Sequence, residues 1–249
     1  MISYAQNFED VILARALRSV DHGFYVDIGA WHPDRHSVTR HFYEEGWCGI
    51  NVEPGRTYFG HLERQRPRDV NLNMVVSDPP GKVAFHEAPH SGLSGADEGV
   101  IETARRHGIE PSTYDVEAIT LADLLARHAG EREIHFLKID VEGHEPLVLR
   151  SGDWARFRPW IVVVEAISPS GDSTHEAFDA DLRAQRYAFA YFDGLNRFYV
   201  RAESAELLQH FALPPNVFDG IARFPDDRLG HAMERIYSLC RRAYRRIAR

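Results

Sequence analysis

Residues 134–145, IHFLKIDVEGHE, place an apolar strand directly before three acids and a histidine. Residues 134–139 and 160–164 have the continuous apolar character of parallel strands that are covered on both faces. Residues 24–28 read as a third such strand, and helical patterns lie between the strands. Strands that alternate with helices predict a parallel sheet with right-handed crossovers. In such open sheets, ligands bind beyond the carboxyl ends of the strands.

The rest of the chain completes an α/β pattern. Asp193-Gly194-Leu195-Asn196 lies between two short apolar segments and predicts a hairpin that makes one edge strand antiparallel. Residues 87–115 start with Gly, Ser and Pro and are expected to be an irregular insertion or lid. We divide the chain into an α/β domain at 1–203, which holds the candidate site residues, and a helical extension at 204–249 that is basic at its end.

Composition and charge exclude several classes of protein. The 249 residues carry a net charge of −8, and the last nine, RRAYRRIAR, hold five arginines and no acid, so the first 240 carry −13. An acidic body argues against a nucleic-acid groove. No apolar run approaches the length of a membrane span. Two cysteines are too few for a disulfide framework, which favours a reducing cytoplasm.

Two strand ends suggest a nucleoside site. Gly29 follows the first strand, and Glu53 ends the second, where an acid commonly accepts hydrogen bonds from ribose hydroxyls. The loop after Gly29 continues with Ala, Trp, His and Pro and lacks the GxGxxG that a pyrophosphate requires. S-adenosylmethionine, a nucleoside without phosphates, fits this pattern better than a dinucleotide. The alternative is that Gly29 only ends a strand and Glu53 is a surface acid.

The acids after residue 139 suggest either donor binding or catalysis. Asp140 and Glu142 could face a sulfonium or an ammonium, and His144 or Asp140 could accept the proton of a hydroxyl. Glu165 follows the next apolar strand, so Asp140, His144 and Glu165 could also ligate Mg²⁺, although a histidine is a poor ligand for it. The alternative is a solvated first helical turn at Glu142 and Glu145.

Other features leave several functions open. His32 and His36 suggest contacts to substrate or, with Asp140 and Glu165, a metal-dependent hydrolase. Capping of a helix by Asp34 beside surface histidines is a further interpretation. A nicotinamide-dependent sugar enzyme and a non-catalytic glycan-binding module on the same fold are also considered. Leu, Met, Ile, Cys and Tyr recur at helical spacing over 229–244, which predicts an amphipathic helix that contacts an anionic membrane or packs on its own domain.

Eight segments together resemble the FkbM-type methyltransferase family, a branch of the class I S-adenosylmethionine-dependent enzymes. They are YAQNFEDVILARAL at 4–17, GFYVDIGAWHP at 23–33, SVTRHFYEEGWCGINVEP at 37–54, VVSDPPGKVAFH at 75–86, ITLADLL at 119–125, FLKIDVEGHEPLVLRSG at 136–152, RPWIVVVEA at 158–166 and FDGLNRFYV at 192–200. The resemblance covers most of residues 3–200. His32-Pro33 stands where many class I members have a further glycine.

The resemblance implies a Rossmann-like fold with a mostly parallel seven-stranded sheet, helices on both faces and a C-terminal antiparallel hairpin. It implies methyl transfer from S-adenosylmethionine to a hydroxyl, of a small molecule, sugar or glycan, in the cytoplasm or at the inner face of its membrane. Oligomerisation stays open. The residues that match the family's motifs are Tyr4, Gln6, Asn7, Asp10, Asp27, Gly29, Glu53, Ser77 and Asp78 for the donor, and Asp140, Glu142 and His144 near the reacting centre. Together with the strand ends, we expect Ala30, Asp140 and Glu142 also at the donor; Asp140, His144 and Glu165 in catalysis; and His32, His36 and Asn196 at the substrate.

Overall fold

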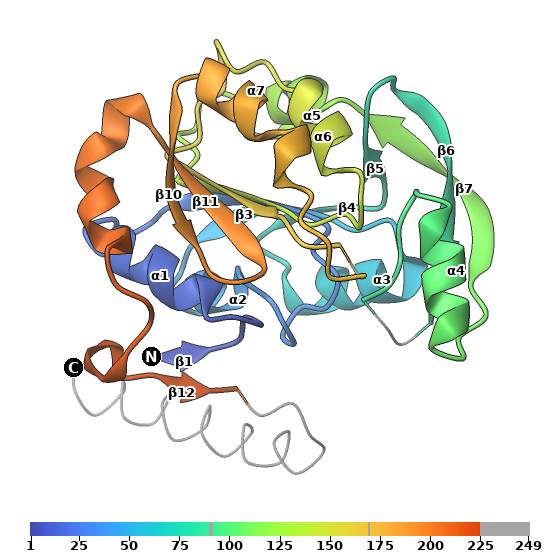
Figure 1. The fold of residues 1–249 in the computed structure, drawn as a ribbon, viewed down its shortest axis with the longest axis horizontal. Helices are drawn as coiled ribbons and strands as arrows, with labels where there is room; N and C mark the ends of the chain where they lie inside the picture. The colour runs from blue at the N-terminus through green and yellow to red at the C-terminus, as the bar shows by residue number, and fades with distance from the viewer. Residues whose placement is uncertain (90–91, 169, 225–249) are drawn as a thin grey trace.

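A computed structural model describes residues 1–89, 92–168 and 170–224 and is built around a seven-stranded sheet (Figure 1). The strand order is β10-β11-β9-β8-β2-β3-β4. The strands are β2 (Phe24–Ile28), β3 (Cys48–Val52), β4 (Val70–Leu72), β8 (Phe136–Ile139), β9 (Ile161–Glu165), β10 (Tyr187–Phe192) and β11 (Asn196–Arg201). The prediction of a large, mostly parallel α/β sheet is confirmed. The sheet is mixed, because β11 runs antiparallel to β9 and β10 runs antiparallel to β11.

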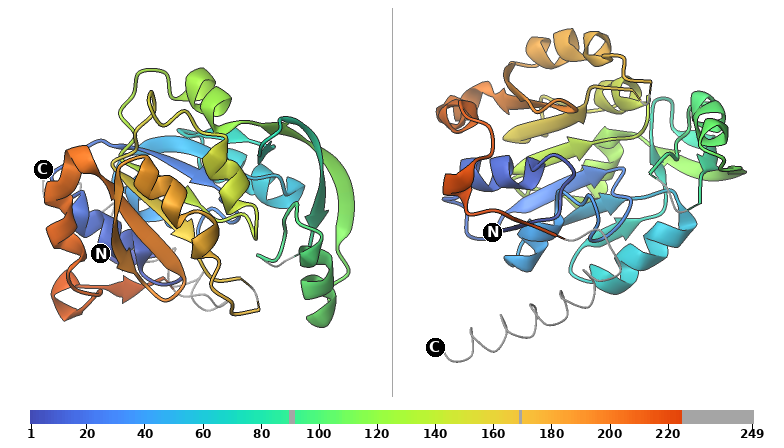
Figure 2. Two further views of the ribbon diagram at one scale, coloured as in Figure 1. Left: turned by 45° about the horizontal axis from the view of Figure 1, so that its top comes forward. Right: turned by 60° about the horizontal axis from the view of Figure 1, so that its bottom comes forward.

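Helices cover both faces of this sheet, which explains its apolar strands. One face packs on α5 (Leu121–His128), α6 (Glu145–Arg150) and α7 (Asp179–Ala184). The other packs on α1 (Glu9–Ala16), α2 (Arg40–Glu44) and the 3-10 helix η2 (Ala202–Phe211). Figure 2 shows these layers from two further sides. The four apolar residues of β9 are fully buried whichever face they point to, as expected for a doubly covered strand.

A second, three-stranded sheet lies beside the first and consists of β5 (Val75–Val76), β6 (Gly81–Glu87) and β7 (Ser112–Ile119). The chain leaves the large sheet at Asn73, whose side chain donates to the carbonyl oxygens of Glu53 and Pro54. The segment expected to be irregular, 87–115, contains α4 (Gly99–Arg106) and the start of β7. That expectation is wrong for residues 112–115, because they pair with β6 in antiparallel register.

The ends of the described chain meet below the large sheet (Figure 1). β1 (Ile2–Ser3) pairs in parallel with β12 (Ala222–Arg223). Two further 3-10 helices are η1 (His175–Ala177) and η3 (Val217–Asp219). In the described ranges, no helix has the length and apolar character needed to cross a bilayer. The amphipathic helix expected over 229–244 lies outside the described residues, and the division at residue 203 stays a prediction.

Candidate functional site

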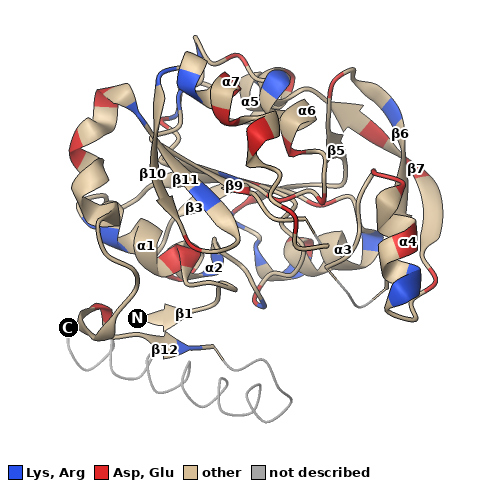
Figure 3. Cartoon of the chain, viewed as in Figure 1, with Lys and Arg blue, Asp and Glu red and all other residues tan. Residues whose placement is uncertain are grey.

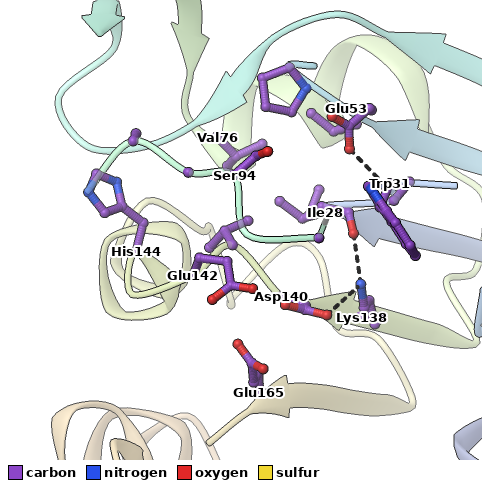
Figure 4. Close-up of a pocket in the computed structure, with 18 of the residues that line it drawn as sticks. Ile28, Trp31, Glu53, Val76, Ser94, Lys138, Asp140, Glu142, His144 and Glu165 are labelled. Atoms are coloured by element: carbon purple, nitrogen blue, oxygen red, sulfur yellow. Dashed lines mark hydrogen bonds and ion pairs between the residues drawn. The ribbon is translucent and has the colours of Figure 1, made fainter. Parts of the chain in front are cut away.

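A cavity of about 410 Å³ opens at the carboxyl ends of the parallel strands. Residues that follow four neighbouring strands line it, because parallel register brings their ends into one row: Gly29 after β2, Glu53 after β3, Asp140 after β8 and Glu165 at the end of β9. Figure 4 shows these carboxylates around the cavity. The place of the site at this edge is the one that the sequence predicts.

The loop after β2 is pressed against both neighbouring strands. Gly29 has a φ of +84°, and a Cβ at this position would lie 1.8 Å from the carbonyl oxygen of Asp140. The backbone N–H groups of Gly29 and Ala30 both donate to the carbonyl oxygen of Val52. Only glycine combines this conformation with such a close approach. Any larger residue at position 29 would therefore collide with the backbone of Asp140, beside the cavity.

Glu53 forms a fixed acceptor on one wall of the cavity. Its carboxylate accepts hydrogen bonds from the backbone N–H of Trp31 at 2.8 Å and of Gly55 at 2.6 Å. Burial raises the pKa of Glu53 to about 7, although the two N–H donors lower it. Each carboxylate oxygen has a further lone pair for a ligand hydroxyl. Apolar side chains also line the cavity, among them Val52, Met74, Val76 and Phe85.

Three carboxylates on the other side of the cavity form an acid cluster, which we define as Asp140, Glu142 and Glu165. One oxygen from each lies within 4.8 Å of the others, and the side chains point toward one another in Figure 4. Burial and then the charge of Asp140 raise the pKa of Glu165 to about 11 and that of Glu142 to about 8. Such a cluster is costly unless a cation faces it.

Lys138 is the cation that faces the acid cluster from within the protein. Its ammonium lies 3.2 Å from Asp140 and 3.4 Å from Asp27, and it donates to the carbonyl oxygen of Gly29 at 2.8 Å. Burial lowers the pKa of Lys138, but Asp140 and Asp27 outweigh burial and raise it. Sequence reasoning missed this residue. Its signal was a lone lysine inside an apolar, doubly covered strand.

The N-terminal segment contributes Gln6 and Glu9 to the cavity wall. Glu9 accepts hydrogen bonds from the Asn196 amide at 2.8 Å and from the backbone N–H of Asn7 at 2.7 Å. Burial, and next the charge of Asp193, raise the pKa of Glu9 to about 8. The resemblance places this segment at the donor through Tyr4, Gln6, Asn7 and Asp10, but sequence reasoning missed Glu9 itself. Asn196, expected to contact substrate, supports Glu9 and lies outside the cavity lining.

The other expected residues divide into two groups. His36 and His144 line the cavity, and so does Trp31. Ala30 lines it too, whereas seven others lie outside the lining: Tyr4, Asn7, Asp10, Asp27, His32, Ser77 and Asp78. Asp10 fixes the N-terminal segment by accepting from the Ser3 hydroxyl and the Tyr4 backbone N–H.

The histidines do not join the acids in a metal-type cluster. In the ranges that the structure describes, the one group with metal-ligand spacing is Asp140, Glu142 and Glu165. Glu142 thus takes the place that the sequence gives to His144. Burial lowers the pKa of His144, although Asp97 opposes the effect. A lowered pKa favours the neutral imidazole, which can accept a proton.

Comparison with known proteins identifies one family. The model of the methyltransferase FkbM domain matches residues 27–189. Among solved structures, the chain is similar to a methyltransferase FkbM from Methylobacillus flagellatus KT, with 13% identity and a TM-score of 0.46. The similarity covers 72% of this chain and 44% of that one, so it spans less than half of the length of that protein. The comparison with curated proteins gave no match.

Proposed function

Because this chain belongs to the FkbM methyltransferase family, we propose that it transfers a methyl group from S-adenosylmethionine to a hydroxyl oxygen of a sugar or glycan. The observation that carries the proposal is the pairing, in one cavity, of the fixed Glu53 carboxylate with the acid cluster. Glu53 suits a ribose, and the cluster suits a cation. S-adenosylmethionine has both groups in one molecule.

The cavity lining offers a partner for each part of the donor, namely its ribose, its adenine and its charged methionine tail. Glu53 would accept the ribose hydroxyls, with the apolar side chains of Val76 and Phe85 beside it for the adenine. Asp140, Glu142 and Glu165 would face the sulfonium and the ammonium of the methionine tail. The loop after Gly29 offers bulky side chains and a proline, so it is a poor cradle for phosphates. A nucleotide donor therefore fits less well.

The chain contributes orientation and a proton acceptor to the reaction. When bound, the donor supplies a methyl group on a positively charged sulfur. Lys138 orients the Asp140 carboxylate through a 3.2 Å ion pair. His144, whose half-buried side chain lines the cavity, would accept the hydroxyl proton. Positioning supplies most of the rate, and a base adds about 10²–10⁴-fold.

The same acid cluster also has the ligand chemistry of Mg²⁺, which prefers carboxylate oxygens. Asp140, Glu142 and Glu165 would hold the ion, and it would polarise a substrate hydroxyl. The hydrolase alternative has less support, because His32 lies outside the cavity lining and neither His32 nor His36 belongs to the acid cluster. Calorimetry on protein treated with a chelator separates donor binding from metal binding.

The first test is calorimetry with S-adenosylmethionine and its demethylated product. We expect micromolar binding of both to the wild-type protein, and the absence of binding at millimolar concentration would defeat the proposal. Asp140→Asn should then reduce methyl transfer to a panel of glycans by about 10²-fold or more, because the carboxylate that faces the reacting sulfur loses its charge. Asp115→Asn changes an exposed acid on β7 and serves as the matched control.

A further inference from the structure

An apolar prong projects from the opposite side of the molecule from the small sheet, and we define it as residues 213–218 (Figure 1). Leu213, Val217 and Phe218 are 64%, 87% and 96% exposed. The other large apolar side chains that are exposed in the described ranges, Phe189 and Phe192, reach only 36% and 43%. Three such side chains within six residues form a local feature of the kind that marks interaction sites.

The prong is held rigidly and does not owe its exposure to a loose loop. Arg15 of α1 donates to the carbonyl oxygens of Leu213 at 2.7 Å and Pro214 at 3.2 Å. The same guanidinium binds the Asp219 carboxylate at 2.6 Å. Asn216 and Asp219 form a reciprocal capping box around η3. The backbone is thus fixed by many hydrogen bonds, while its apolar side chains are kept in solvent.

Two exposed arginines, Arg18 and Arg223, lie near the prong in the described part of the chain. The charge of Asp219 is neutralised by Arg15, and the exposed Arg18 lies near His210, just before the prong. Arg223 is exposed on β12, where Figure 3 shows a basic residue in blue, and its guanidinium donates to the carbonyl oxygen of Gln6. In the sequence, residues 225–249 hold seven arginines and three acids. Basic charge next to exposed apolar side chains is the combination that anionic lipid surfaces attract.

We propose that the prong inserts into the headgroup region of an anionic bilayer, with the neighbouring arginines on the lipid phosphates. A bilayer accepts a narrow tip, whereas a stable dimer buries about 1,200–2,000 Å² in total. An aromatic side chain buries about 150–250 Å², so three side chains on a tip fall short of that area. The proposal does not depend on the methyl-transfer function, because it uses no residue of the cavity.

The test uses the full chain and vesicles of phosphatidylcholine, either alone or with about one third of the anionic lipid phosphatidylglycerol. We expect binding to the anionic vesicles that weakens with salt. The double variant Val217→Ser, Phe218→Ser should bind at least about tenfold more weakly, because it removes two apolar side chains that would be buried in the bilayer. Phe192→Ser is the control, because it removes an exposed aromatic ring elsewhere.

Several outcomes would overturn the proposal. They are no binding by the wild-type chain, equal binding to neutral vesicles, and unchanged binding by the double variant. A dimer that the double variant loses, without vesicle binding, would assign the prong to a second copy of the chain. Phe218→Trp gives an independent readout, because its fluorescence should be quenched by brominated lipids if residue 218 enters the bilayer.

Discussion

Two sets of charged side chains in the described part of the chain differ in how they are paired. Arg66 is fully buried and donates to the Pro33 carbonyl oxygen, the Ser37 hydroxyl and the Tyr25 hydroxyl. Asp69 accepts from the Tyr25 hydroxyl, from Asn51 and from the backbone N–H of Gly49. We refer to this set as the Arg66–Asp69 network. Its opposite charges lie 3.7 Å apart.

The acid cluster at the cavity is arranged in the opposite way. Three carboxylates face one another, and Lys138 pairs closely with only one of them, Asp140. A paired network is costly to break but does not need a ligand. Unpaired carboxylates reduce the stability of the free protein and gain when a cation binds. The difference therefore separates a structural set of charges from a set that we propose to bind a ligand.

The largest expected effect concerns the stability that the Arg66–Asp69 network provides. Arg66→Met leaves the Asp69 carboxylate buried without its cation, and we expect the free energy of unfolding to fall by about 3–5 kcal/mol. Urea unfolding followed by circular dichroism measures the change. Arg64→Met, an exposed position on the same helix, is the control and should stay within about 0.5 kcal/mol of the wild type. If Arg66→Met lowers the free energy of unfolding no more than Arg64→Met does, the Arg66–Asp69 network is not a structural set of charges.

The next effect concerns the acid cluster, where we expect a substitution to increase the free energy of unfolding. The pKa of Glu165 is raised to about 11 in the folded protein, so its contribution to stability is complete at low pH and is lost as pH rises. Glu165→Gln removes this cost, and we expect the free protein to gain about 1–2 kcal/mol at pH 8. Donor affinity should fall about tenfold, because one carboxylate no longer faces the cation.

Thermal unfolding between pH 5 and 9 and calorimetry with the donor measure the two effects of Glu165→Gln. Glu176→Gln, an exposed acid on η1, is the control. A variant that loses both stability and donor affinity would show that Glu165 belongs to a structural set, like Asp69. A variant that keeps full affinity would show that the cation lies elsewhere.

Residues that line the cavity are predicted well from the sequence when they directly follow a strand. They are predicted poorly when they lie inside a strand or come from a distant part of the chain. Gly29, Glu53, Asp140 and Glu165 are predictable, because parallel strands bring their carboxyl ends to one edge whatever the exact packing. Lys138 was missed because it lies within a strand whose apolar neighbours mask it. Glu9 reaches the cavity only because the N-terminal segment is anchored far along the chain.

That anchor could not be read from local patterns. β1 pairs with β12 more than two hundred residues later, and Arg223 donates to the carbonyl oxygen of Gln6 at 2.8 Å. The role expected for Asn196 changed for the same reason, since its amide donates to Glu9 across the fold. Local periodicity gives elements and their ends, whereas contacts between the two ends of a chain depend on the assembled structure.

The smallest expected effect asks whether Glu53 belongs with the ligand set. Burial raises the pKa of Glu53 to about 7, with Glu87 adding to the shift and the N–H donors of Gly55 and Trp31 and the charge of Lys138 opposing it. Ribose hydroxyls donate best to the ionised carboxylate, so binding should release a proton and strengthen as pH rises through 7. Adenosine isolates this effect, because it lacks the charged tail that faces the acid cluster. We expect its affinity to rise about five- to tenfold between pH 5.5 and 8, measured by calorimetry, and to be independent of pH in Glu53→Gln. A flat profile in the wild type would place Glu53 with the Arg66–Asp69 network, as a carboxylate that its own backbone donors satisfy.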